Sequence, residues 1–113
     1  MARVIASFLL TKYVHRMYND NMKFTRDPKK ALVNLKKHKV SFEEAISVFY
    51  DPLAKISSDP DHSEEEDHFI LVGHSSRNRL IFVVHVYRES ENTIRIISAR
   101  LAVKRERLDF ENL

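Results

Sequence analysis

The stretch that decides the fold is IRIISAR, residues 94–100, an apolar run with an arginine near each end. Its β-branched residues and alternating pattern predict an extended strand rather than a helix. Alternation divides the strand into two faces, one with Ile94, Ile96 and Ser98 and the other with Thr93, Arg95 and Ile97. If helices cover the isoleucine face, Arg95 points to the open face, and Arg100 lies where the strand ends.

The residues before this strand also have extended patterns. RLIFVVHVY, residues 79–87, is apolar at both alternating sets of positions, which predicts a central strand. SSRN, residues 75–78, has the composition of a hairpin turn in which Asn78 takes a left-handed conformation. RESEN, residues 88–92, is a second turn. The segments predicted as strands of an antiparallel sheet are residues 53–56, 68–74, 79–87 and 93–98.

Helical patterns precede the strands. Asp27 and Pro28 form an N-cap and first-turn pair, after a short strand candidate at residues 23–25. The first helix is predicted to run to about His38. Its side chains predicted to point inward are Ala31, Leu32 and Leu35, and those left in water are Lys29, Lys30, Lys36 and Lys37.

A second helix is predicted from VSFEEAISVF, residues 40–49. Ser41 and Glu44 have the spacing of a capping box, in which each side chain accepts a hydrogen bond from the backbone of the other. The apolar stripe of this helix is formed by Phe42, Ala45, Ile46 and Phe49. Asp51 and Pro52 end it.

The C-terminal segment, Leu101 to Leu113, has helix-forming residues but few apolar ones. Leu101 and Leu108 form its stripe, with Val103 or Phe110 to one side. A helix with so narrow a stripe is weakly held by its own domain. The element order is therefore β-α-α, three or four antiparallel strands, and α, which predicts an α+β fold with helices on one face of a small sheet.

Length and composition predict one domain. We expect residues 22–113 to form it and residues 1–21 to be an extension, whose apolar run at residues 4–10 is too short to span a membrane. The chain has no cysteine, which excludes disulfides and thiolate metal sites and is compatible with the cytoplasm. Six of the 16 acidic residues and none of the 19 basic ones lie in residues 57–68. The rest of the chain is thus strongly basic, which favours a polyanionic partner, although solvation of a small domain explains such charges equally well.

Three segments together resemble the BrnT family of bacterial toxins. They are DPKKALVNLKKHKVSFEEAISVFYDP, GHSSRNRLIFVVHV and IRIISARLAVKRERLDFE, and they cover most of residues 22–111. The resemblance implies a fold similar to RelE messenger-RNA interferases and a ribonuclease that inhibits translation, without a metal or other cofactor. It also implies RNA as substrate, a ribbon-helix-helix antitoxin similar to BrnA as partner, and operator DNA bound through the toxin–antitoxin complex. A toxin dimer and a heterotetramer with the antitoxin both stay open.

Three positions depart from the family pattern: Arg26 replaces a usual tryptophan, Lys39 a common glycine, and His68 the basic residue that often opens its strand. These changes keep an alternative open, in which the chain binds its partners but cleaves RNA weakly or not at all. A third class, a structural dimerisation domain, also remains.

Metal-independent RNA cleavage needs groups that bind phosphate and groups that carry protons. Arginine suits the first role because its planar fork matches phosphate oxygens and stays charged. The predicted catalytic residues are Arg79, Arg95 and Arg100 for phosphate, and His85, His38 and Glu106 for protons. His85 is expected in the same open groove as Arg95. The predicted RNA-binding residues are Arg88, Lys104, Arg105 and Arg107, and the predicted antitoxin contacts are Leu101, Leu108 and Phe110.

Each candidate also has a structural interpretation. Arg79 and Arg95 suit ion pairs with Glu89 or Glu91 across the sheet. His38 and His85 suit packing positions on a helix and a strand. An ion pair within its helix accounts for Glu106 equally well. His62 and His68 lie in a segment too acidic and irregular to predict a metal site.

Overall fold

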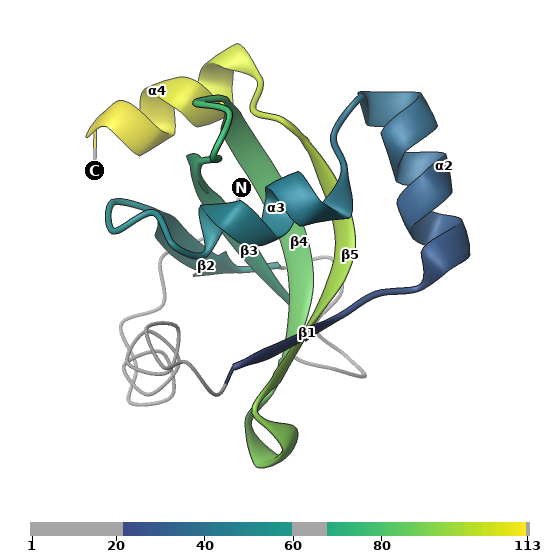
Figure 1. Cartoon of the computed structure of the whole chain (residues 1–113). Coiled ribbons are helices and arrows are strands. Elements are labelled where there is room, and N and C mark those ends of the chain that lie inside the picture. Colours follow the sequence, from purple (N-terminus) through teal and green to yellow (C-terminus); the bar gives the residue numbers. More distant parts are fainter. Residues whose placement is uncertain (1–21, 60–67, 113) are drawn as a thin grey trace.

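One five-stranded sheet organises the molecule (Figure 1). The computed structural model describes residues 22–59 and 68–112. Its elements are β1 (Lys23–Thr25), α2 (Pro28–His38), α3 (Phe42–Val48), β2 (Lys55–Ser58), β3 (His68–His74), β4 (Leu80–Arg88), the 3-10 turn η1 (Glu89–Glu91), β5 (Thr93–Leu101) and α4 (Lys104–Asn112). The predicted acidic loop and N-terminal extension lie largely outside the described residues.

The sheet has the order β1-β5-β4-β3-β2, so β4 is central, as its apolar residues predicted. Strands β2 to β5 pair in antiparallel fashion, and the hairpin turn between β3 and β4 contains Asn78 at φ 58°. The expectation of a purely antiparallel sheet is wrong, because β1 pairs with β5 in parallel. The three residues of β1 are too few to carry a sequence pattern that would identify the neighbouring strand or the direction of pairing. The strand expected at residues 53–56 lies two residues later, as β2.

Helix α3 covers one face of the sheet (Figure 1). Its buried side chains Phe42, Ala45 and Val48, followed by Phe49, pack on a sheet core that includes Leu71, Ile81, Val83, Ile94 and Ile96. Each large apolar side chain buried here contributes about 1.5–3 kcal/mol to folding. The N-cap was predicted correctly, since Ser41 Oγ accepts a hydrogen bond from the Glu44 amide at 3.0 Å.

Helix α2 lies beside the β5 edge rather than on the face of the sheet (Figure 1). The prediction that Leu32 and Leu35 point inward is wrong, because their exposed fractions are 57% and 42%. The buried residue of α2 is Asn34 instead. Its amide donates to the Val40 and Ala99 carbonyls at 3.0 and 2.8 Å, and its side-chain oxygen accepts from the Ala99 amide at 3.1 Å. The Asn34 side chain thus makes the two hydrogen bonds with the Ala99 backbone that a neighbouring strand would otherwise make.

Helix α4 begins three residues later than predicted and contains no buried residue. It is not on the face that α3 covers. Phe110 lies edge-on to His74, with 5.7 Å between ring centroids, and its carbonyl accepts a hydrogen bond from Lys55 Nζ at 2.6 Å. Of the three helices described, one therefore covers a face, one an edge, and one a corner of the sheet.

Candidate functional site

A β-bulge in β5 brings Arg95 and Arg100 to the same face of the sheet. Val84 pairs with Ser98 and the next β4 residue, His85, pairs with Ile96, so Ile97 is an extra residue. Arg95 lies opposite Val86 and Arg100 opposite Phe82, and these two β4 positions share a face because they are four residues apart. Without the bulge, the five-residue spacing would place the two arginines on opposite faces.

The bulge also changes which residues of β5 lie on each face, compared with the prediction from regular alternation. Ile94 and Ile96 lie in the core as expected, but Ala99 joins them there and Ser98 does not. The regular alternation of the sequence contains no sign of the extra residue, so this shift could not be predicted from it.

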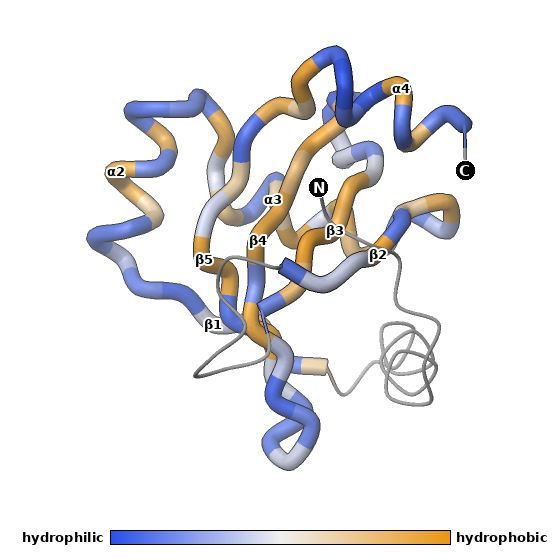
Figure 2. Tube along the Cα trace, turned by 180° about the vertical axis from the view of Figure 1, so that it is seen from behind, coloured by the Kyte–Doolittle hydropathy of each residue, from blue (hydrophilic) through white to orange (hydrophobic). Residues whose placement is uncertain are grey.

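The face opposite to α3 is called the far face below and is the side seen in Figure 2. The register places apolar side chains on its two middle strands, namely Ile70, Val72, Phe82, Val84 and Val86. Polar side chains lie on the strands to either side, namely Lys55 and Ser57 on β2 and Arg95, Ser98 and Arg100 on β5. Of the lysine and arginine side chains named here, β5 carries two, Arg95 and Arg100, and β2 carries one, Lys55.

Arg100 is held in place from two directions. Its Nη1 and Nη2 donate to the two carboxylate oxygens of Glu106 at 2.7 and 2.8 Å. Its guanidinium also lies over the Phe82 ring, 4.1 Å from the centroid. These contacts fix the guanidinium plane above the end of the far face.

Glu106 connects this arginine to the start of α4. Burial acts to raise the pKa of Glu106, but the hydrogen bonds from Arg100 and from the Val103 amide, together with the charges of Arg100 and Arg105, outweigh it and lower the pKa below its usual value. The carboxylate is therefore ionised at neutral pH and holds Arg100, which makes it a poor proton acceptor in this arrangement.

The expectation that His85 shares an open groove with Arg95 is wrong. His85 is 0% exposed and lies on the α3 side, with its ring centroid 4.8 Å from that of Phe49. Burial lowers the pKa of His85 to about 3, so its ring is uncharged at neutral pH. A residue enclosed in this way is part of the core.

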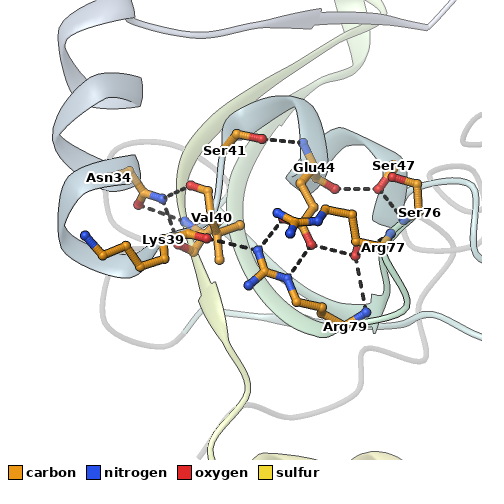
Figure 3. Close-up of polar contacts among 11 residues, drawn as sticks. Asn34, Lys39, Val40, Ser41, Glu44, Ser47, Ser76, Arg77 and Arg79 are labelled. Carbon is orange, nitrogen blue, oxygen red and sulfur yellow. Dashed lines mark hydrogen bonds and ion pairs between the residues drawn. The ribbon is translucent and has the colours of Figure 1, made fainter.

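Arg79 also lies on the α3 side, in the polar network of Figure 3. Its Nε and Nη2 donate to the Glu44 carboxylate at 2.9 and 2.5 Å, and Nη2 donates to the Lys39 carbonyl at 2.9 Å. Ser75 Oγ donates to the same carboxylate at 2.7 Å. The ion-pair partner is thus Glu44, not Glu89 or Glu91, and Arg79 and Arg100 lie at the same end of the sheet on opposite faces.

Other predicted site residues lie apart from one another. His38 ends α2 and lines a groove between that helix and β5. Arg88 lies at the opposite end of β4 from Phe82, 3.9 Å from Glu91. Lys104, Arg105 and Arg107 are exposed on α4. Of the predicted antitoxin contacts, Leu101 and Leu108 are exposed, whereas Phe110 is half-buried.

His68 was not among the predicted site residues, because its sequence position marks it only as a departure from a family pattern and as a poor metal ligand. It opens β3 opposite Val86, which on its other side pairs with Arg95. A histidine and an arginine therefore lie in one row across the far face. Only the strand register, which the sequence does not state, could have revealed this.

No curated protein matches the chain. Residues 27–106 match the family of the ribonuclease toxin BrnT of type II toxin–antitoxin systems. The chain belongs to the BrnT family. It is therefore a toxin of a type II toxin–antitoxin system. Toxins of this family have an antitoxin as partner and RNA as substrate. The segments that carried the resemblance lie within or next to this match, so the predicted family is confirmed.

The fold agrees with this BrnT assignment. A 1.1 Å crystal structure of the Brucella abortus ribonuclease toxin BrnT matches with a TM-score of 0.53 and 25% sequence identity, over 74% of this chain and 100% of that one. Among the described residues of this BrnT protein, no group of three or more metal-ligating side chains comes together, and no helix is long and apolar enough to cross a membrane.

Proposed function

We propose that this BrnT protein is a metal-independent endoribonuclease that inhibits translation in the cytoplasm and is neutralised by a ribbon-helix-helix antitoxin. The observation that carries the proposal is the placement of Arg95 and Arg100 on one face of the sheet by the β5 bulge. Two guanidinium groups on one polar strand suit the backbone of RNA, which presents a negative charge at every nucleotide.

The two arginines serve separate phosphates of one RNA strand. Four residues along β4 separate their partners, which corresponds to about 13 Å at a strand rise of ~3.3 Å per residue. Arg95 holds the phosphate that is cleaved and stabilises the charge that builds up on it. Arg100, held by Glu106 and Phe82, binds a phosphate further along the strand.

Cleavage uses the 2′-hydroxyl of the RNA as nucleophile. It attacks the adjacent phosphorus, the bond to the 5′-oxygen breaks, and the products carry a 2′,3′-cyclic phosphate and a free 5′-hydroxyl. One group removes the proton of the 2′-hydroxyl and another protonates the leaving 5′-oxygen. His68, in the row of Arg95, and His38, in the groove beside Ser98, are the proposed proton carriers.

A purified chain tests this proposal directly. Arg95→Ala is expected to lower the rate of RNA cleavage at least 100-fold, by loss of transition-state charge stabilisation. Arg100→Ala is expected to act mainly through weaker RNA binding, and Lys36→Ala, an exposed cation on α2, serves as the control. Intact RNA at concentrations of the chain that arrest growth on induced expression would refute the ribonuclease proposal.

A second candidate function is a binding module that cleaves RNA weakly or not at all. The observation that favours it is the use of two predicted phosphate-binding forks for internal carboxylates, Arg79 by Glu44 and Arg100 by Glu106. Growth arrest without RNA cleavage, relieved by the antitoxin, would distinguish this function from the first.

The antitoxin contact is proposed at α4 and the end of β5, where Leu108 and Leu101 stay exposed. An antitoxin dimer bound there would join two toxin chains into a heterotetramer, and its DNA-binding part would bring the complex to operator DNA.

A further inference from the structure

A groove of about 330 Å³ lies between α2 and β5, beside the arginines of the far face. We propose that it binds one nucleotide of a single-stranded RNA, next to the nucleotides held by the arginines of β5. This inference rests on the proposed function for its choice of RNA. Its lining residues that matter here are Lys29, Lys30, Lys37, Val33, Ile97 and Ser98.

The lining has the chemistry of a nucleotide site. Lys29, Lys30 and Lys37 supply three positive charges from α2, which suits a phosphate at the mouth of the groove. Val33 from the helix and Ile97 from the strand supply apolar surface, which suits the flat face of a base. Cations beside an apolar slot favour a nucleotide over a free phosphate ion.

The β5 bulge shapes the groove. Ile97 is the extra residue of the bulge, and both it and Ser98 line the groove. Bulges redirect side chains in this way and are frequent beside active sites. The hydrogen bonds of Asn34 to Ala99 hold α2 at a fixed distance from β5, so the groove is preformed.

The position of Ser98 connects the groove to the far-face site. Ser98 lines the groove and also lies on the far face between Arg95 and Arg100. A single RNA strand can therefore pass from the groove over the β5 edge to the arginines. The volume is at the lower end of small-ligand pockets, which admits one unpaired nucleotide but not a duplex.

The charge of the groove is tested with a short 2′-O-methyl oligoribonucleotide, which binds but cannot be cleaved because its 2′-oxygens are blocked. Replacing Lys30 and Lys37 with alanine together is expected to weaken binding about tenfold. The slope of log affinity against log salt concentration should fall by about 0.7 for each lysine removed. Lys36→Ala, one position from Lys37 but outside the lining, is the matched control.

The apolar part is tested by a pair of substitutions on α2. Val33→Glu places a carboxylate inside the groove and is expected to weaken oligonucleotide binding at least tenfold. Leu32→Glu adds the same charge to a similarly exposed neighbouring position outside the lining. Since both side chains are exposed, folding should tolerate both changes, as thermal unfolding will verify.

The outcomes separate this inference from the proposed function. If the chain cleaves RNA but Val33→Glu binds as well as Leu32→Glu, the groove proposal is overturned and the ribonuclease stands. If the chain cleaves no RNA but the pair still differs in binding, the groove stands as a nucleotide site. Equal sensitivity of double-stranded RNA or DNA to these variants would show a general cationic surface and overturn the groove proposal.

Discussion

At the scale of single residues, Glu44 matters more than its sequence position indicated. The capping box predicted that the Glu44 side chain accepts a hydrogen bond from the Ser41 backbone. Only the other hydrogen bond of this motif forms, from the Glu44 amide to Ser41 Oγ. The carboxylate instead accepts hydrogen bonds from Arg79 and Ser75. Through these contacts one buried acid joins α3 to the turn before β4 (Figure 3).

Glu44→Gln is expected to lower the free energy of unfolding by about 2–4 kcal/mol at neutral pH, since it leaves Arg79 without its counter-charge. The hydrogen bonds from Arg79 lower the pKa of Glu44 most strongly, burial opposes them, and Ser75 adds to them. Because the pKa of Glu44 is lowered by folding, its carboxylate stabilises the fold at pH values above the ordinary pKa of 4.5. This stabilisation is lost as the pH falls from that value through the lowered pKa. Urea unfolding at several pH values measures this effect.

The matched control for this prediction is Glu43→Gln, which changes an exposed acid that contacts Arg26. Its effect should stay below about 1 kcal/mol. If the two variants were equally stable at neutral pH, the stabilising role assigned to Glu44 would be refuted.

Lys39 occupies a backbone conformation that suits glycine. It ends α2 at φ 60°, and its amide donates to the Leu35 carbonyl at 2.9 Å. Lys39→Gly is therefore expected to raise the free energy of unfolding by up to about 1 kcal/mol. Lys37→Gly, inside the same helix, should lower it by a similar amount. Denaturant titration of both variants checks the opposite signs, and a loss of stability in Lys39→Gly would contradict the argument.

At the scale of elements, the sequence predicts correctly the helices and strands that are determined by their own residues. Asp27 caps α2, Pro28 begins it, and β3 spans His68–His74 as predicted. The parallel pairing of β1, the orientation of α2 and the bulge at Ile97 depend instead on contacts with distant residues. The face of Arg95 was predicted from the alternation, but the placement of Arg100 on the same face follows from that bulge and was not.

The lack of buried residues in α4 leads to a prediction for antitoxin binding. Deleting residues 105–113 is expected to weaken antitoxin binding at least 100-fold while lowering the melting temperature by only about 4–8 °C. The helix adds little core, yet it carries the exposed Leu108. Calorimetric titration with the antitoxin, beside thermal unfolding, measures both effects. An unchanged affinity would move the antitoxin contact elsewhere.

At the scale of the whole molecule, cations from two sides gather at β5. Lys29, Lys30 and Lys37 come from α2, whereas Arg95 and Arg100 come from the strand itself. The net charge of the chain is only +3, so its distribution rather than its total suits a polyanion. RNA binding should therefore weaken steeply with added salt.

Cleavage is expected to persist when EDTA removes divalent ions, since the proposed chemistry relies on guanidinium and imidazole groups. The rate in EDTA should stay within about threefold of the rate without it, once ionic strength is matched. Analysis of the product ends for 2′,3′-cyclic phosphate supplies a second readout. Loss of cleavage in EDTA, restored by magnesium, would rule out the metal-independent mechanism.

The hydrogen bonds of Asn34 have a consequence for how copies of the chain meet. Beyond the three residues of β1, the outer edge of β5 would otherwise offer the Ala99 amide and carbonyl to any strand nearby. The side chain of Asn34 occupies both groups and leaves no place there for a strand from a second molecule. Joining two copies through a continuous sheet is thereby blocked on this side, so the toxin chain can accumulate beside others without polymerising through this edge.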